Sequence, residues 1–260
     1  MIEEKQVIIN DLLVNYFAAE TDPAAPTVVF LHGWRSEARV WMPVLNSCAA
    51  TGKYNLYALD FPGFGKSEKP KQAYKLDDFR DIVLEFCKKL NLEKISLVGH
   101  SFGGRVAIKL TIVTNVAIEK LVLVDSAGFK TRSAKKGLLN TIAKITKPAF
   151  KLPGVRDLRP RIYKLIGAED YLAADTPEIR QTFLNIINED LTADMKKVKV
   201  PTLILWGADD KDTPVNFGKR LHSAILNSKF EILPHAGHFS FLDDPRHFVD
   251  SVIGFLDQNV

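Results

Sequence analysis

Residues 95–104 read Ile95-Ser-Leu-Val-Gly-His-Ser-Phe-Gly-Gly104 and pass from an apolar run to a serine that lies between glycines. The run predicts a short strand, and the segment Arg105–Val113 has the pattern of a helix, so Ser101 falls in a sharp turn between them. Such a turn strains the serine backbone, and we expect Gly99 and Gly103 to be small because strand and helix come close there. The amides at the start of the helix would favour negative charge near the hydroxyl.

The composition is that of an ordinary globular protein. The chain has 260 residues, of which 46% are hydrophobic and 25% charged, and it is long enough to bury roughly three quarters of its unfolded surface. The charged start, Met-Ile-Glu-Glu-Lys-Gln, and the absence of an apolar run near ~20 residues predict a cytoplasmic protein without a membrane span. The two cysteines, Cys48 and Cys87, lie in helix-like segments and favour neither a disulfide framework nor a metal cluster.

Strand-like and helix-like segments alternate along most of the chain. The predicted strands cover residues 6–9, 12–18, 27–31, 54–59, 95–98, 120–125, 202–206 and 229–233, and the predicted helices cover 40–50, 75–90, 105–113, 215–226 and 245–256. The first two strands flank the turn pair Asn10-Asp11 and are expected to form an antiparallel hairpin. The alternation that follows implies right-handed crossovers, and therefore an α/β fold with a mostly parallel sheet and helices on both faces.

The alternation stops at Gly128. From residue 129 to 195 the periodicity is helical, with breaks at Pro148, Pro153, Pro160 and Pro177, and no strand-like run appears. We therefore predict one α/β domain made of residues 1–128 and 196–260, with an all-helical cap inserted at 129–195.

Acidic and basic side chains follow the predicted strands in an order that suggests a catalytic constellation. A serine hydroxyl becomes a nucleophile when a histidine takes its proton and a carboxylate orients that histidine. After the last strand the chain reads Pro234-His-Ala-Gly-His-Phe239, where His238 is favoured over His235 because Gly237 allows a sharp turn before it. After the preceding strand, Trp206-Gly-Ala-Asp-Asp-Lys-Asp-Thr-Pro214 offers the carboxylate. The order Ser, Asp, His is the one found in hydrolases with a nucleophile elbow.

Four motifs together resemble the α/β-hydrolase fold family, in particular its members with a helical cap. They are Leu31-His-Gly-Trp34, Asp60-Phe-Pro-Gly-Phe-Gly-Lys-Ser67, Gly99-His-Ser-Phe-Gly103 and Pro234-His-Ala-Gly-His238, and the likeness covers the whole chain except the detail of 129–195. In that family the acid commonly lies three residues after the glycine of a Gly-x-x-Asp turn, with a proline four residues later. The resemblance therefore implies Asp210 rather than Asp209 or Asp212. Some members carry the acid after the strand that precedes the cap, so Asp125 remains an alternative.

The developing oxyanion needs two backbone N–H groups, and by position Trp34 and Phe102 are expected to supply them. We expect structural roles for His32, His100, Asp60 and Ser67, which flank turns or the glycine-rich loop. The chain has no GxGxxG after its first strand and no GK[ST] phosphate loop, which argues against nucleotide binding. We predict no metal, organic cofactor or nucleic-acid partner. A serine at the nucleophile position also argues against the haloalkane dehalogenase and epoxide hydrolase branches of the family.

The predicted cap is strongly asymmetric in charge. Residues 129–164 contain eleven Lys and Arg with Asp157 as the one acid, whereas 165–195 contain seven acids with Arg180 as the one base. Ala134–Phe150 also has apolar residues near one face, so it could meet an anionic membrane surface or an acidic substrate as an amphipathic helix. We favour the plainer interpretation, in which this segment packs over the active site and pairs with the acidic half of the cap.

Three functions fit these motifs. The first is a serine hydrolase that cleaves carboxylic esters of small molecules through an acyl-enzyme, with Ser101, His238 and Asp210 as its triad. The second is a carbon–carbon bond hydrolase of aromatic ring-cleavage products, which resembles the first in its triad. The third is a ligand sensor on the same fold that has kept the triad without turning over a substrate.

Overall fold

The computed structural model describes residues 1–113, 116–130 and 176–258. Its strands are β1 (Glu3–Ile9), β2 (Leu12–Ala19), β3 (Thr27–Leu31), β4 (Asn55–Leu59), β5 (Lys94–His100), β6 (Ala117–Val124), β7 (Thr202–Gly207) and β8 (Ser228–Leu233). Its helices are η1 (Ala38–Trp41), α1 (Met42–Ala49), α2 (Leu76–Lys89), α3 (Phe102–Thr111), α7 (Pro177–Asn188), α8 (Thr192–Met195), α9 (Asn216–Ala224), α10 (Ser240–Asp243) and α11 (Pro245–Leu256).

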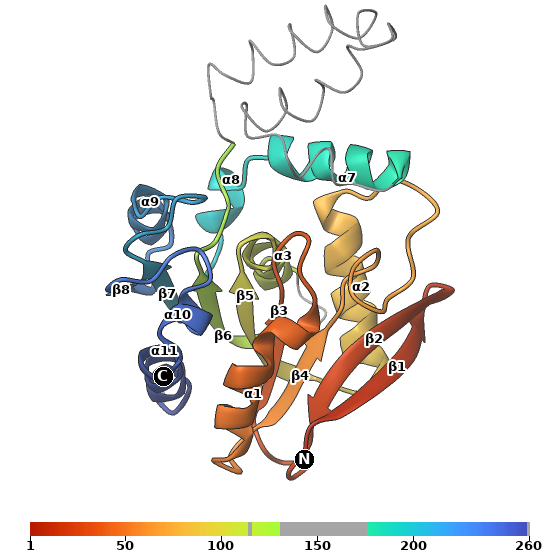
Figure 1. Cartoon of the computed structure of the whole chain (residues 1–260), viewed down its shortest axis with the longest axis horizontal. Helices are drawn as coiled ribbons and strands as arrows, with labels where there is room; N and C mark the ends of the chain where they lie inside the picture. The colour runs from red at the N-terminus through yellow and green to blue at the C-terminus, as the bar shows by residue number, and fades with distance from the viewer. Residues whose placement is uncertain (114–115, 131–175, 259–260) are drawn as a thin grey trace, which may run out of the picture. The chain divides into compact units, whose positions relative to one another are not determined.

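The strands form one eight-stranded sheet in the order β1-β2-β4-β3-β5-β6-β7-β8 (Figure 1). β1 and β2 form the predicted antiparallel hairpin, whose turn residues Asn10 and Asp11 have the positive φ of a tight hairpin turn. β2 pairs antiparallel with β4, and every pairing from β4 to β8 is parallel. The predicted fold class is therefore confirmed.

Helices cover both faces of this sheet (Figure 1). α1 and α11 contact each other over one face, where Trp41 stacks on Phe241 with ring centroids 4.2 Å apart and Phe248 is fully buried. α2 and α3 contact each other on the other side of the sheet. Strands β4 and β7 are buried along their whole length, which explains why their sequences are continuous apolar runs rather than alternating ones.

The topology brings the carboxyl ends of β5, β6, β7 and β8 together in that order. Ser101 follows β5, Asp125 follows β6, Asp210 lies just after β7 and His238 lies beyond β8. In open sheets of this kind, ligands bind outside the carboxyl ends of the strands. The residues predicted to be catalytic therefore lie together at the carboxyl end of the sheet, although they are far apart in the sequence.

The helix after the serine begins earlier than the sequence pattern suggests. α3 starts at Phe102, so Gly103 and Gly104 lie in its first turn instead of preceding it. Glycine has a low helix propensity, which is why the pattern points to a start at Arg105. Close packing against the neighbouring strand ends overrides that preference, as the site geometry shows.

By contacts between residues, the chain divides into two compact units. One contains Met1–Pro70, Leu76–Phe129 and Asp190–Val260, and the other contains Lys71–Lys75 with Lys130–Glu189. In the described part of the second unit, α7 is capped by Thr176, whose Oγ1 accepts a hydrogen bond from Ile179 N at 3.3 Å. α7 also holds the segment 71–75, because Thr182 Oγ1 accepts from Tyr74 N at 2.8 Å.

Two of the predictions fall largely outside the described residues. The helical insertion at 129–195 is described only at residues 129–130 and 176–195. The second of these stretches contains α7 and α8, and the extent of the insertion stays a prediction. The basic segment Ala134–Phe150 lies wholly outside the described residues, so its contact with a membrane or with the rest of the cap stays a prediction as well. Of the helices that the structure describes, none has the length and apolar character needed to cross a bilayer.

Candidate active site

The turn at Ser101 has the strain that its sequence predicts. Ser101 has φ 49° and ψ −109°, a backbone conformation that residues other than glycine rarely adopt. A Cβ at Gly99 would lie 2.7 Å from Gly103 O, and one at Gly103 would lie 2.2 Å from Leu31 O. Gly99 is therefore small because α3 lies against β5, and Gly103 is small because α3 also lies against the end of β3.

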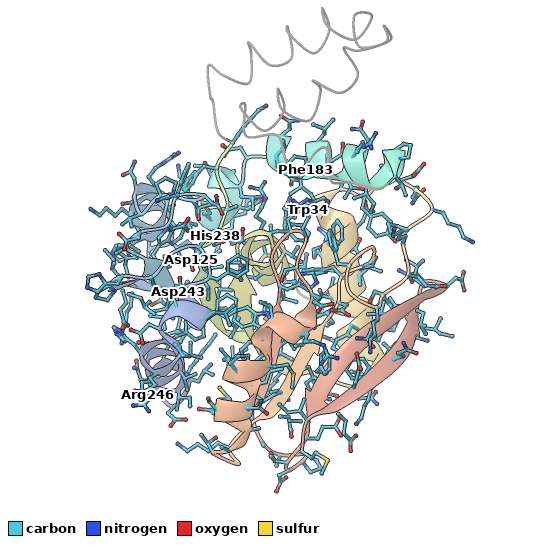
Figure 2. All side chains as sticks on the ribbon, viewed as in Figure 1. Trp34, Asp125, Phe183, His238, Asp243 and Arg246 are labelled. Carbon is cyan, nitrogen blue, oxygen red and sulfur yellow. The ribbon has the colours of Figure 1, made fainter. Side chains whose placement is uncertain are left out.

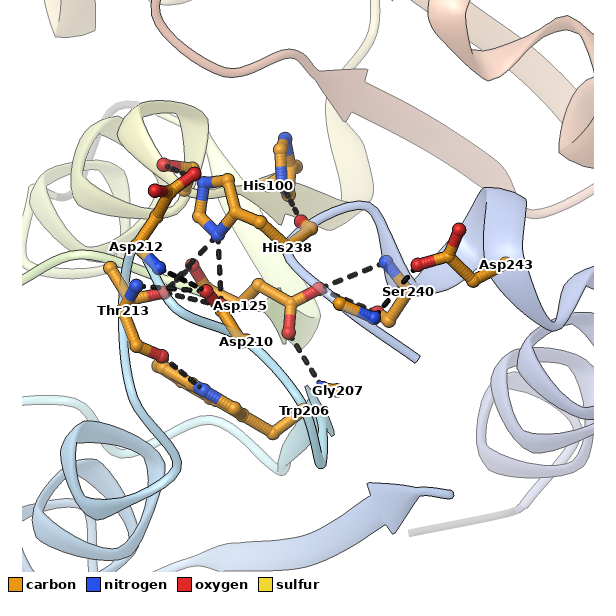
Figure 3. A network of polar contacts seen from close by, with 12 residues as sticks. His100, Asp125, Trp206, Gly207, Asp210, Asp212, Thr213, His238, Ser240 and Asp243 are labelled. Carbon is orange, nitrogen blue, oxygen red and sulfur yellow. Dashed lines mark hydrogen bonds and ion pairs between the residues drawn. The ribbon is translucent and has the colours of Figure 1, made fainter. Parts of the chain in front are cut away.

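Three of the predicted residues form one chain of hydrogen bonds. His238 Nε2 lies 3.0 Å from Ser101 Oγ. On the other side of the ring, His238 Nδ1 lies 2.8 Å from Asp210 Oδ2 (Figure 3). Because a carboxylate only accepts, Nδ1 carries the proton and Nε2 of the neutral ring accepts from the serine hydroxyl. This is the tautomer that a general base for Ser101 requires.

The turn that follows β7, residues 207–213, is called the acid turn below. It holds the carboxylate of Asp210 from several sides. Oδ1 accepts hydrogen bonds from Asp212 N at 2.8 Å and Thr213 N at 2.9 Å, and Oδ2 lies 2.7 Å from Thr213 Oγ1. Burial alone would raise the pKa of Asp210, but the contact with His238 and the bonds from Thr213 outweigh it, so this pKa lies below its usual 3.8. Asp210 is therefore an ionised, oriented carboxylate.

Opposing influences also act on His238. Burial lowers its pKa, but the hydrogen bond and the negative charge of Asp210 raise it more, so the pKa lies above its usual 6.5. The main chain of His238 is held by His100, whose Nε2 donates to His238 O at 2.7 Å. Burial lowers the pKa of His100 to about 3, so this neighbour stays neutral.

The alternative acid, Asp125, lies in the same region but makes different contacts. Its side chain is fully buried, and its Oδ1 accepts from Gly207 N at 2.7 Å. Its Oδ2 accepts from Ser240 Oγ at 2.5 Å and from Ser240 N at 3.3 Å. Burial raises the pKa of Asp125 to about 7, against the effect of these hydrogen bonds. The contact with His238 Nδ1 thus comes from Asp210, while Asp125 contacts the loops around it.

The residues predicted to supply oxyanion amides lie beside the serine. A Cβ at Gly33 would lie 3.5 Å from Ser101 Cβ, so the Gly33–Trp34 main chain passes next to Ser101. The rings of Trp34 and Phe102 meet edge to face with centroids 5.7 Å apart. Figure 2 shows Trp34 and His238 rising from separate loops at the carboxyl end of the sheet. Their neighbourhood fits an oxyanion hole, and the role of the two amides stays a prediction.

The residues expected to be structural do hold turns. His32 Nδ1 donates to Gly33 O at 2.7 Å, and its Nε2 accepts from Phe61 N at 3.0 Å. Asp60 Oδ1 accepts from Ala38 N at 2.6 Å and Oδ2 from Lys66 N at 2.9 Å. Ser67 Oγ donates to Asp60 O at 2.8 Å. These contacts fix the glycine-rich loop beside the site.

Sequence reasoning missed three contributors to this geometry. Thr213 contacts both the acid and the histidine, Ser240 binds Asp125, and Gly104 has no room for a Cβ, which would lie 2.1 Å from Ser126 Oγ. Thr213 had a local signal, since an Asp whose oxygen accepts N–H groups two and three residues ahead forms a recognisable turn. Ser240 and Gly104 had none, because their partners are distant in the sequence. Among the described residues, no cluster of three or more His, Cys, Asp and Glu is arranged to hold a metal.

Comparison with known proteins assigns the family. The sequence model of the alpha/beta hydrolase family matches residues 28–251. A 2-hydroxy-6-oxo-6-(2'-aminophenyl)hexa-2,4-dienoic acid hydrolase of Metapseudomonas resinovorans is 27% identical over 248 residues, covering 89% of this chain and 84% of the relative. A pimeloyl-[acyl-carrier protein] methyl ester esterase of Nitrosomonas europaea is 27% identical over 251 residues, covering 88% and 95%. The solved structure of an esterase from Exiguobacterium antarcticum is similar with a TM-score of 0.78 at 23% identity, covering 98% of this chain and 100% of the other. This chain belongs to the alpha/beta hydrolase family.

Proposed function

We propose that this chain is a serine hydrolase that cleaves carboxylic esters of small molecules through an acyl-enzyme. The observation that carries the proposal is the continuous contact from Asp210 through His238 to Ser101, at 2.8 Å and 3.0 Å. An oriented base beside a strained, glycine-flanked serine is what acyl transfer requires. The esterase relative from Nitrosomonas europaea supports an ester as the substrate class.

The chemistry follows from the three side chains. Ser101 Oγ attacks the ester carbonyl while His238 Nε2 takes its proton, and Asp210 stabilises the imidazolium that forms. His238 then gives the proton to the leaving alkoxide, so the ester C–O bond breaks and the acyl group stays on Ser101. A water molecule repeats the sequence, with His238 again as base, and releases the carboxylic acid and free Ser101.

Negative charge collects on the carbonyl oxygen in both tetrahedral intermediates. The backbone N–H groups of Trp34 and Phe102 are the proposed donors to that oxygen, and Phe102 also lies at the start of α3, where the helix dipole favours an anion. One such donor contributes about 2.7–4 kcal/mol to the transition state. Because these are main-chain groups, substitution of either side chain tests them poorly.

Replacement of the nucleophile tests the proposal. Ser101→Ala removes the attacking oxygen, and we expect kcat on short p-nitrophenyl esters to fall by about 10⁶-fold with the fold retained. A fluorophosphonate probe should label the unmodified chain at Ser101 and leave the variant unlabelled. If Ser101→Ala kept most of the activity, the acyl-enzyme mechanism would be wrong.

The same probe separates the enzyme from a ligand sensor. A sensor that has kept the triad without using it would bind ligand but react with neither the fluorophosphonate nor the esters. Labelling of Ser101 together with turnover therefore supports the hydrolase, and the absence of both supports the sensor.

A second candidate reaction is hydrolysis of a carbon–carbon bond in a ring-cleavage product. Two relatives favour it by name, the hydrolase from Metapseudomonas resinovorans and a 2-hydroxy-6-oxononadienedioate/2-hydroxy-6-oxononatrienedioate hydrolase. The triad serves both reactions, so it does not separate them. Side-by-side turnover of simple esters and of a vinylogous 1,5-diketone acid does, and we expect kcat/KM to be higher for the ester.

A further inference from the structure

A buried carboxylate, Asp125, joins the two loops that carry Asp210 and His238. These are the acid turn and the histidine loop, residues 234–240. Its strand, β6, lies between the serine strand β5 and the acid strand β7. Asp125 Oδ1 accepts from Gly207 N at 2.7 Å, where the acid turn begins, and Oδ2 accepts from Ser240 Oγ at 2.5 Å, two residues beyond the histidine (Figure 3). One side chain is therefore bonded to both loops.

The two loops also touch each other at the point that Asp125 holds. A Cβ at Gly207 would lie 2.2 Å from Gly237 O and 2.5 Å from Ala236 O. Asp209 N donates to Ala236 O at 2.9 Å. The acid turn and the loop before His238 thus pack backbone against backbone. A shift of Gly207 would be passed on to the acid and the base together.

The main chain of Asp125 makes a further connection, through Thr213. Thr213 Oγ1 lies 3.0 Å from Asp125 O, 2.7 Å from Asp210 Oδ2 and 3.3 Å from His238 Nδ1. This hydroxyl lies between the strand end that carries Asp125 and the carboxylate that contacts the histidine. Asp125 is therefore connected to the acid turn at its start and again near its end.

The backbone of Asp125 directs the carboxylate into this junction. Asp125 has φ 45°, in the left-handed region that residues other than glycine adopt only where their surroundings hold them. Its N–H donates to Leu205 O at 3.0 Å, which fixes the turn against β7. Both carboxylate oxygens accept hydrogen bonds from the loops, so the side chain acts on Ser101 only through other residues.

We propose that Asp125 is a positioning residue that holds the acid turn and the histidine loop in the geometry needed for proton transfer. The inference rests on the proposed serine hydrolase function and goes beyond it, because it assigns a role to a carboxylate outside the triad. A positioning role affects the chemical step more than substrate binding. It therefore predicts a loss in kcat with little change in KM.

Asp125→Asn is the primary test. Asn offers one acceptor oxygen where Asp offers two. With that oxygen on Gly207 N, the amide group can donate to Ser240 Oγ but faces the N–H of Ser240, and the negative charge is gone, so the link to Ser240 is weakened. We expect kcat on p-nitrophenyl esters to fall by about 10- to 100-fold, as for a displacement near 1 Å, with KM within about two-fold. The labelling rate of Ser101 by the fluorophosphonate should fall with kcat. Asp210→Asn is the reference for loss of the acid itself, at about 10⁴-fold.

A second variant keeps the carboxylate and removes one partner. Ser240→Ala deletes the 2.5 Å bond to Asp125 Oδ2, and we expect a smaller loss in kcat, about 3- to 10-fold. The double variant Asp125→Asn/Ser240→Ala should be no worse than Asp125→Asn, since both changes act on the same link. The single variant Ser240→Ala tests the proposal even if Asp125→Asn folds poorly.

Asp244→Ala provides a control for stability alone. Asp244 caps α11, where its Oδ1 accepts from His247 N at 3.3 Å, so its loss lowers Tm without releasing either loop. We expect its kcat to stay within about two-fold of the unmodified chain. A fall in kcat that tracks Tm in all variants would show that Asp125 is merely structural and would overturn the proposal.

Two other outcomes overturn it. If Asp125→Asn and Ser240→Ala keep the kcat and labelling rate of the unmodified chain, the link between the loops does not matter for the reaction. If Asp125→Asn loses as much as Asp210→Asn, Asp125 is acting as the acid. Failure of the proposed function looks different, because the unmodified chain itself would then be neither labelled at Ser101 nor active on esters.

Discussion

In the proposed mechanism His238 accepts a proton from Ser101, so its own pKa sets the acid side of the pH profile. Because Asp210 raises that pKa above 6.5, the neutral base is lost as the pH falls through a value above 6.5. We expect kcat/KM for an ester to rise with pH across this midpoint. The measurement is a pH–rate profile between about pH 5 and pH 9.

Asp210→Asn should move this profile in a defined direction. Without the carboxylate the imidazolium loses its main stabilising charge, so the pKa of His238 falls and the acid limb shifts to lower pH, while kcat falls by about 10⁴-fold. Asp209→Asn is the matched control, since it changes the adjacent, exposed carboxylate in the same turn and should leave both kcat and midpoint in place. An unshifted midpoint in Asp210→Asn would contradict the assignment of the acid.

At the scale of single residues, the sequence predicts well what each strand end carries. Short motifs with local signals point to Ser101 and His238, the resemblance to a family selects Asp210 among three neighbouring acids, and the structure brings the three side chains into contact. The bond between Asp125 and Ser240 joins residues 115 positions apart, and no local pattern reveals it. Contacts of this kind depend on how two loops fold over the sheet, which sequence spacing does not determine.

The strand–turn–helix element at Ser101 has no room for a Cβ at its glycines. In Gly103→Ala the new Cβ would lie 2.2 Å from Leu31 O, and backbone atoms cannot turn aside as a flexible side chain does. We expect the free energy of unfolding to fall by about 1–3 kcal/mol, as in other overpacked cores. Activity should fall as well, because α3 moves together with the amide of Phe102. Urea unfolding and ester turnover measure the two effects.

Gly254→Ala is the matched control within the same protein. Gly254 lies inside α11, and a Cβ there would have no neighbouring atom within 4 Å. Alanine has the higher helix propensity, so this change should raise the free energy of unfolding by about 0.5–1 kcal/mol. Equal stabilities of the two alanine variants would contradict the steric reading of Gly103.

At the scale of elements, the predictions fail where packing overrides propensity. The pattern places the start of the helix at Arg105, but α3 begins at Phe102 because its glycine-containing turn lies against β3 and β5. The buried strands, in contrast, were recognisable from continuous apolar runs such as Thr27–Leu31. Periodicity thus identifies an element, and the neighbouring elements determine where it ends.

The whole molecule contains two fully buried neutral histidines, and these make its stability depend on pH. Burial lowers the pKa of His32 to about 4 and that of His100 to about 3, below the 6.5 of an unfolded histidine. Between pH 6.5 and pH 4 the unfolded chain binds more protons at both positions. The contribution of the two histidines to the free energy of unfolding is therefore full above pH 6.5 and is lost as the pH falls. Each histidine contributes a slope approaching about 1.4 kcal/mol per pH unit.

Urea unfolding at pH 7, 6 and 5 measures this slope. His100→Asn should be less stable than the unmodified chain at pH 7, because the bond to His238 O is altered, yet its stability should vary less with pH. Asp125, whose pKa is raised to about 7, contributes a slope of opposite sign, so the comparison of the two chains isolates the contribution of His100. An equal pH dependence in the unmodified chain and in His100→Asn would contradict the burial of His100 as a neutral ring.

At the scale of the whole chain, the sheet and its order of motifs follow from the sequence, since alternating strands and helices leave few arrangements. The extent of the cap and its interaction with substrate do not. Helical periodicity at 129–195 predicts helices without saying which face meets which neighbour, and the charge asymmetry there fits more than one partner.

The position of β8 has a consequence for how the protein fails on heating. β8 lies at one edge of the sheet, Leu233 is its one buried residue, and the loop after it carries His238. Edge strands open locally at lower free energy than central ones. Warming should therefore move His238 away from the site while Ser101 is still held between β5 and α3. Ester turnover should decline below the melting temperature seen by circular dichroism, and it should return on cooling as the edge re-forms.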